Sequence, residues 1–170
     1  MKESLYEQLV KDNPELFEKG ECEFSIGNGW YNIMACLLAI ITSDLNQARY
    51  CLKYEKEHPT NDGGAKLATL EARVEKALED LPTIVQVKEK FGGLRFYYNG
   101  GTPEIHGAVS MAEAMASRTC EVCGSPGERR GGDWIQTLCD SHYRAQEELA
   151  AARKQGRRLP AINYDAEDEE

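Results

Sequence analysis

Residues suited to acid–base or hydrolytic catalysis are scarce in this sequence. Only three of its 170 residues are histidines. The chain contains no phosphate-binding loop, no nucleophile elbow, no H-E-x-x-H pair and no grouping of serine, histidine and aspartate that would indicate a triad. Because catalytic proton transfer needs such positioned groups, we expect a protein that is not an enzyme.

Long apolar runs and an excess of positive charge are also missing. No apolar run reaches the length of about 18 residues that would indicate a membrane-spanning helix, and no signal peptide is recognisable. We therefore expect a cytoplasmic protein with no membrane partner. The formal net charge of −9 argues against indiscriminate nucleic-acid binding. The charge is uneven, because residues 118–158 carry eight Lys or Arg against six Asp or Glu, whereas residues 165–170 carry five acidic side chains.

Four potential metal ligands form two pairs with the same spacing. Cys120 and Cys123 are three positions apart, as are Cys139 and His142, and 15 residues separate the two pairs. This is the spacing of a structural zinc site. Three thiolates and one imidazole complete a tetrahedral shell and leave no position for water or substrate, so we expect one structural zinc ion per chain rather than a catalytic metal. Two disulfides, or no metal at all, are the alternatives.

The other three cysteines share no obvious pattern; they are Cys22, Cys36 and Cys51. An odd number left after the ligands are assigned argues for reduced thiols, which agrees with a cytoplasmic location. The sequence assigns them no role.

The residues around the ligands predict a small module. Gly124 follows Cys123 and supplies the positive φ that such a turn usually needs. Glycines and a proline predict turns around a short hairpin, and a helix is expected at 143–154. A knuckle, a hairpin and a helix that carries ligands resemble the treble-clef arrangement. We expect three apolar side chains to pack beside the metal: Trp134, Ile135 and Leu138.

Three arginines flank the ligands and allow two interpretations. A zinc ion with three thiolates and a neutral imidazole carries a net charge of about −1. Arg118, Arg129 and Arg130 would either offset this charge or form a rim that binds phosphate.

Most of the chain before the cysteine pairs has helical periodicity. Apolar residues recur at helical spacing in residues 2–11, 30–57, 65–81 and 103–117. The stripe in residues 30–57 is the widest, so we expect this segment to form one long central helix. In the last helix four residues are expected to face inward: Ile105, Val109, Ala112 and Met115.

The strongest strand signal lies at residues 84–98. Two runs rich in β-branched and aromatic residues flank Gly92 and Gly93, which predicts a hairpin with these glycines as its turn. In that register Lys90 faces Arg95. The apolar face that would pack on the helices consists of Val85, Val87, Glu89, Phe91, Leu94, Phe96 and Tyr98. The opposite face carries Lys88, Lys90, Arg95 and Tyr97.

The basic side chains of this hairpin need neighbours that offset them. Like charges placed directly opposite one another cost stability. Carboxylates nearby in a solvated face would offset them, and so would a bound anion or nucleic acid. Glu89, the one carboxylate in the apolar face, needs a partner of its own if it is buried.

Three stretches of the chain resemble a family of small phage and prophage proteins, most of them uncharacterised. They are residues 29–31, 86–97 and 118–142. The resemblance covers roughly residues 27–142. It implies a phage gene product that acts inside a bacterial host cell, and it assigns no catalytic residue.

Together these features predict an α+β protein in three parts. They are a helical body with one β-hairpin at 1–117, a treble-clef-like zinc module at 118–156 and a mobile acidic tail at 157–170. We expect non-enzymatic binding of a host macromolecule, most of all a host protein such as a defence or replication enzyme that the binding would inhibit. The alternative is nucleic-acid binding through Lys88, Lys90, Arg95, Tyr97, Arg118, Arg129 and Arg130.

Overall fold

The chain folds into six α-helices, two short 3-10 helices and five strands within the residues that the computed structural model describes, which are 1–18, 22–131 and 134–156. This confirms the α+β class. The predicted acidic tail at 157–170 lies outside the described residues. In chain order the elements are α1 (Glu3–Asp12), η1 (Pro14–Leu16), β1 (Glu23–Ser25), η2 (Asn28–Trp30), α2 (Tyr31–Ile41), α3 (Ser43–Glu57), α4 (Ala65–Glu79), β2 (Thr83–Lys90), β3 (Gly93–Asn99), α5 (Pro103–Ala116), β4 (Glu128–Arg130), β5 (Gln136–Leu138) and α6 (Asp140–Lys154).

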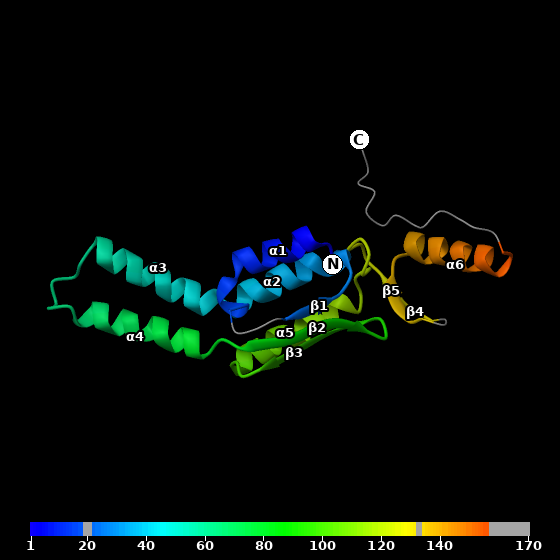
Figure 1. Ribbon diagram of the computed structural model, residues 1–170. Coiled ribbons are helices and arrows are strands. Elements are labelled where there is room, and N and C mark those ends of the chain that lie inside the picture. The colour runs from blue at the N-terminus through cyan, green and yellow to red at the C-terminus, as the bar shows by residue number, and fades with distance from the viewer. Residues whose placement is uncertain (19–21, 132–133, 157–170) are drawn as a thin grey trace.

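The molecule is elongated, with three regions along its length (Figure 1). At one end α3 and α4 project as a pair of helices. The middle holds α1, α2 and α5 around the sheet formed by β1, β2 and β3. At the other end lie the β4–β5 hairpin and α6, so the predicted metal ligands are far from the α3–α4 pair.

The hydrophobic core lies in the middle region, between the helices and one face of the sheet. β1 pairs parallel with β2, and β2 pairs antiparallel with β3, so β2 is the central strand. α2 contains no charged residue, and its Met34 and Leu38 are fully buried. They belong to one cluster with Val87 and Leu94 of the sheet. Burial of each such side chain stabilises the fold by roughly 1.5–3 kcal/mol.

The prediction of one long helix at 30–57 is wrong, because the helix breaks at Thr42. The Thr42 hydroxyl donates to the carbonyl oxygen of Leu38 at 3.0 Å and lies 3.2 Å from the side-chain oxygen of Asn13. Ser43 adds a bond from its hydroxyl to the carbonyl oxygen of Ile40 at 2.7 Å. Hydroxyl groups that bond to the preceding turn bend helices. Here the bend separates α2, which lies in the core, from α3, which contributes Leu45 to the core near its start and then leaves it.

The α3–α4 pair is held at its tip by a buried carboxylate. Glu55 of α3 is only 3% exposed. It forms an ion pair of 2.7 Å with Lys66 and accepts a 2.6 Å hydrogen bond from the backbone N–H of Thr60. The hydrogen bonds from Lys66 and Thr60 lower the pKa of Glu55 to about 2. No residue of α4 is buried, although Val74 and Ala77 pack against the main core at the other end of the pair.

The β2–β3 hairpin exists as predicted, but its register is shifted by one residue along each strand. Lys90 pairs with Gly93, and Lys88 lies opposite Arg95. The turn therefore consists of Phe91 and Gly92, whose φ angles are 53° and 74°, rather than of Gly92 and Gly93. Positive φ at both positions is the geometry of a type I′ hairpin turn.

The composition of the predicted apolar face is wrong at two positions. Phe91 sits at the turn and is 60% exposed. Val85 is also exposed, because the pairing is irregular between Ile84 and Gln86 and turns the intervening side chain outward. Val87, Leu94 and Phe96 are buried against the helices, as predicted. Tyr98 and Glu89 are only partly buried, and Ile84, which is not part of the predicted face, is buried with the core.

The helix that leads to the ligands matches its predicted bounds. In α5, Ile105, Val109 and Ala112 face inward as expected, but the fourth inward residue is Ala116, and Met115 is exposed. Across the described ranges, no helix is both long and apolar enough to cross a membrane.

Candidate metal centre

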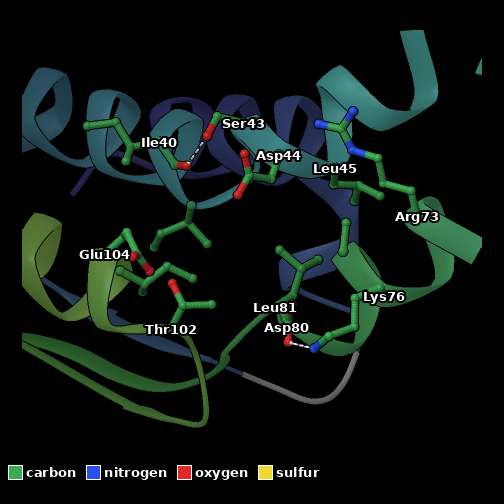
Figure 2. Close-up of a pocket in the computed structure, with 13 residues that line it drawn as sticks. Ile40, Ser43, Asp44, Leu45, Arg73, Lys76, Asp80, Leu81, Thr102 and Glu104 are labelled. Carbon is green, nitrogen blue, oxygen red and sulfur yellow. Dashed lines mark hydrogen bonds and ion pairs between the residues drawn. The ribbon is translucent and has the colours of Figure 1, made fainter. Parts of the chain in front are cut away.

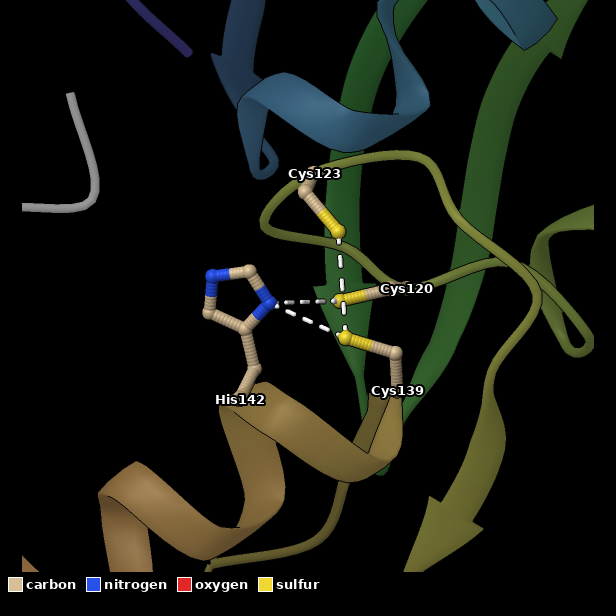
Figure 3. Close-up of side chains that lie close together, drawn as sticks. All are labelled: Cys120, Cys123, Cys139 and His142. Atoms are coloured by element: carbon tan, nitrogen blue, oxygen red, sulfur yellow. Dashed lines mark hydrogen bonds between the residues drawn. The ribbon is translucent and has the colours of Figure 1, made fainter. Parts of the chain in front are cut away.

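Cys120, Cys123, Cys139 and His142 form a cluster that could hold a metal ion, and we call it the Cys3His cluster (Figure 3). The first two cysteines lie on the turn that follows α5, Cys139 lies between β5 and α6, and His142 projects from α6. The three sulfurs and the nearest imidazole nitrogen all lie within 4.8 Å of one another. Two segments separated in the sequence thus present their ligands to a single point.

The distances in this cluster match a tetrahedral ion. A zinc ion with Zn–S bonds of about 2.3 Å places two sulfurs about 3.8 Å apart. The sulfurs of Cys123 and Cys139 are 3.8 Å apart, and Nδ1 of His142 lies 3.7 Å from the sulfur of Cys120. Nδ1 lies 3.1 Å from the sulfur of Cys139, which is the tightest edge. The residues present therefore fit zinc, and all four positions come from the chain.

The local backbone explains why the ligands converge. Gly124 has a φ of +78° and donates its N–H to the carbonyl oxygen of Cys120 at 2.9 Å, which closes the predicted turn. α6 begins at Asp140, earlier than the predicted residue 143, so His142 lies in the first helical turn rather than before it. That position carries the imidazole back over Cys139, whose carbonyl oxygen accepts the N–H of Tyr143 at 2.9 Å.

Two of the thiols differ in their electrostatic surroundings. Burial raises the pKa of the Cys120 thiol to about 11, against hydrogen bonds from backbone N–H groups. At Cys139, burial also acts to raise the pKa, but hydrogen bonds from Ser141 and His142 outweigh it and lower the pKa to about 6. The Ser141 hydroxyl lies 3.2 Å from that sulfur. Since the thiolate is the form that binds metal, Cys139 is better prepared than Cys120 to act as a ligand.

The small apolar cluster beside the ligands differs from the prediction. Leu138 is buried with Cys120 and Cys139, as expected. Trp134 is 67% exposed and Ile135 is also exposed, so their predicted packing beside the metal is wrong. Both precede β5 and face a groove next to the β2–β3 hairpin.

The turn that bears Cys120 is fitted closely to the middle region. Gly29 of η2 donates its N–H to the carbonyl oxygen of Glu121 at 2.9 Å. A Cβ atom on residue 29 would stand 2.2 Å from the carbonyl oxygen of Cys120 and 2.4 Å from the backbone nitrogen of Gly124. The indole N–H of the fully buried Trp30 donates to the carbonyl oxygen of Thr119 at 2.8 Å. Only glycine permits this backbone approach.

A second joint connects the tip of the β2–β3 hairpin to β4 and β5. The Thr137 hydroxyl donates to the carbonyl oxygen of Gly92 at 2.6 Å, in a buried position. The Arg129 guanidinium donates to the carbonyl oxygen of Phe91. The two strongest patterns of the sequence, the hairpin and the paired ligands, are therefore adjacent in space. The division of the chain at residue 117 stays a prediction.

The seven predicted binding residues are distributed over several places. Lys88 and Lys90 line the groove beside Trp134, whereas Arg95 and Tyr97 lie on the neighbouring strand of the same face. Arg129 lies at the hairpin tip. The two remaining residues lie elsewhere; they are Arg118, which is exposed after α5, and Arg130, which is paired with Asp140 and Glu128 and stacks over Tyr143.

Glu121 is a buried acidic residue next to the cluster that sequence reasoning missed. It is 7% exposed, and its carboxylate accepts a hydrogen bond from Gln136. Burial raises the pKa of Glu121 to about 7, and the negative charge of Glu89 adds to this shift. Glu89 itself accepts the N–H of Gly92 at 2.6 Å, which supplies the partner its position requires. A lone glutamate inside a C-x-x-C turn has no periodicity that would have revealed its burial.

A separate cavity of about 420 Å³ lies where α3, α4 and α5 meet (Figure 2). Charged groups of both signs line it, among them Asp44, Arg73 and Glu104. Lys76 is paired with Asp80 at its edge. A hydrogen bond from the Thr102 side chain lowers the pKa of Glu104, which lies in the first turn of α5.

Comparison with known proteins adds no relative, since the chain matches no family model, no curated protein and no solved structure.

Proposed function

We propose that this chain is a non-enzymatic binding protein of a bacterial cytoplasm, stabilised by one structural zinc ion in a module of treble-clef type. The four protein ligands support a structural role for the ion, because they leave no position for water or substrate. Both joints described above attach the Cys3His cluster to the middle region. The ion would therefore fix the position of the hairpin tip and of η2 as well as that of its own module.

The main partner in this proposal is a protein, and the supporting observation is an apolar groove between α2 and α5. The groove has a volume of about 160 Å³. Ile40, Met111 and Met115 on its rim are 51%, 64% and 53% exposed. None of the described residues that line it is charged, in a chain with a net charge of −9. These residues are Asn32, Ile33, Cys36, Leu37, Ile40, Ala108, Met111, Ala112 and Met115.

Such a groove suits the apolar face of a helix from another protein. Helices bind in grooves through apolar side chains spaced three and four residues apart. Methionine side chains adapt their shape to the groups they contact, so Met111 and Met115 would follow such a helix closely. The resemblance to phage proteins suggests a bacterial host as the source of the partner, with a defence or replication enzyme as the kind of target.

The test compares two groups of variants in a pull-down from bacterial lysate. Met111→Glu and Met115→Glu place a charge in the groove and should abolish capture of the partner. Lys88→Glu changes a residue outside this groove and should leave capture intact. If the groove variants capture the same proteins as the wild type, the groove is not the binding site. A concentration-dependent dimer that the same two variants dissolve would instead identify a second copy as the occupant.

A second function, nucleic-acid binding, has one specific observation in its favour. Lys88, Lys90 and Arg95 occur in no ion pair among the described residues, although they lie close together on the exposed face of the sheet. Phosphate groups would offset these charges.

A further inference from the structure

One face of the sheet points away from the helical core. Residues on β2 alternate, so that Val87 points into the core and Lys88 points away from it. The register of the three strands places Ser25 of β1 and Arg95 of β3 on either side of Lys88. The outward face therefore runs across all three strands, and its cations gather on β2 and β3.

Exposed aromatic rings border these cations. Tyr97 is 42% exposed on β3, and Lys88 Nζ lies 5.2 Å from the centre of its ring. Lys90 Nζ lies 5.7 Å from the centre of the ring of Phe91, which is at the turn. Apolar rings of this size are normally buried, so rings left open beside lysines indicate a surface for flat ligands.

Trp134 extends this surface from the other side of the hairpin tip. It lines, together with Lys88, Lys90 and Phe91, an open groove of about 630 Å³. The joint between Thr137 and Gly92 fixes β5, and with it the adjacent Trp134, against the hairpin. The ring is thus presented by a segment that is anchored and is not part of the core.

We infer that this groove binds a single strand of nucleic acid, whose bases stack on Trp134 and Phe91 while Lys88, Lys90 and Arg95 contact its phosphates. The inference rests on the second proposed function and adds to it the class of ligand and the stacking residues. Single strands offer unstacked bases to aromatic side chains, whereas a duplex does not. Glu23 and Glu89 also line the groove, and their charges balance those of the two lysines. With Arg95 beside it the site carries a single net positive charge, which disfavours the dense charge of a duplex.

The experiment is a fluorescence-polarisation titration of the intact zinc-loaded protein with a labelled single strand of ~15 nucleotides and with a duplex of the same length. We expect the single strand to bind more tightly than the duplex. Loss of one base-stacking ring should weaken binding roughly tenfold, so we expect Trp134→Ala to lower the affinity for the single strand by this factor. Trp134→Tyr keeps an aromatic ring and should retain most of the wild-type affinity. Since three cations are involved, the slope of log K against log salt should be about −2, and Lys88→Glu should reduce it.

Several results would overturn the inference. Equal binding by wild type and Trp134→Ala would reject the groove as the binding site. It would leave the proposal that the basic face of the sheet binds nucleic acid. Stronger binding of the duplex would show that the bases are not read by stacking. Absence of binding to either probe would reject nucleic-acid binding altogether. The proposal that the α2–α5 groove binds a protein would be unaffected. Loss of protein capture in the Lys88→Glu variant would assign this face to a protein instead. Met111→Glu is the matched control and should bind the single strand as the wild type does.

Discussion

Gly29 lies so close to Cys120 that a single Cβ atom would separate η2 from the turn that bears the ligand. That atom would stand 2.2 Å from a carbonyl oxygen and 2.4 Å from a backbone nitrogen, neither of which belongs to a flexible side chain. The contact makes the middle region and the Cys3His cluster structurally dependent on each other. It also explains why the motif Gly29-Trp30-Tyr31 and the cysteine pairs, which are distant in the sequence, act as one structural unit.

The first prediction follows from this contact. Gly29→Ala should lower the free energy of unfolding by about 3 kcal/mol, at the upper end of the cost of overpacking, because backbone atoms must move. Urea denaturation measures the change. Gly107→Ala is the control, since a Cβ on this exposed residue of α5 meets nothing within 4 Å. It should stabilise the protein by about 0.5–1 kcal/mol. A neutral Gly29→Ala variant would contradict the close approach.

The second prediction concerns the metal. Elemental analysis of protein purified without added metal should find one zinc ion per chain. Cys139→Ser should abolish this content, whereas Cys36→Ser, which changes an exposed cysteine outside the cluster, should retain it. A zinc content far below one per chain, with cluster thiols oxidised to disulfides, would reject a structural zinc ion.

Removal of the metal should also change the surroundings of Trp30 in η2, which is not a ligand. Metal binding contributes folding free energy to small modules of this kind. The indole of Trp30 bonds to Thr119, one residue before the first ligand. In a Trp134→Phe background Trp30 is the only tryptophan, so chelation should shift its emission to longer wavelength as it meets water. An unchanged spectrum after complete loss of zinc would show that the joint at η2 persists without the ion.

The third prediction concerns the pH dependence of the α3–α4 pair. The pKa of Glu55 is about 2 in the folded protein and about 4.3 when unfolded, so its contribution is fully present above the unfolded value and is lost as pH falls toward 2. Glu55→Gln should therefore destabilise the protein at pH 6, and the difference from wild type should shrink steadily between about pH 4 and pH 2. Thermal unfolding at several pH values measures this.

The matched control for this prediction is Glu57→Gln. Glu57 is exposed, and its ion pair with Lys53 measures 3.9 Å, so this change should have little effect at any pH. A difference between wild type and Glu55→Gln that stays constant from pH 6 to pH 2.5 would show that the Glu55 charge does not stabilise the fold.

The features that the sequence predicts well depend on local spacing. The ligand pairs are three residues apart in each case, and a turn or helix start brings such residues together without help from the rest of the chain. The inward residues of the β2–β3 hairpin follow from alternation in the same way. What the sequence could not predict depends on contacts between distant segments.

Three of these contacts explain the main errors. Asn13 meets Thr42 across 29 positions and supports the break between α2 and α3. Thr137 holds the carbonyl group of Gly92 across 45 positions and favours the observed turn over the predicted one. Trp134 faces the hairpin and not the metal, because the groove that it lines exists only once these two parts have met. No periodicity in one sequence reveals such pairs.

The final prediction uses the unusual backbone of Phe91. Its φ of 53° is rarely adopted by a bulky side chain, and left-handed conformations of such residues cost about 1–3 kcal/mol. Asparagine followed by glycine is the preferred pair in a type I′ turn, so Phe91→Asn should raise the free energy of unfolding by about 1 kcal/mol. Because Asn removes a stacking ring, the same variant should bind a single strand several-fold more weakly.

The two effects of Phe91→Asn separate a structural role from a functional one. If Phe91 served only the fold, the variant would be more stable and would bind single strands as the wild type does. Greater stability with weaker binding would show that the strain at the turn is retained for the exposed ring, as stability is often reduced at functional positions. Val85→Thr, which changes another exposed side chain of β2 away from the turn, is the control and should alter neither property appreciably. Urea denaturation and polarisation titration of the same preparations decide between these outcomes.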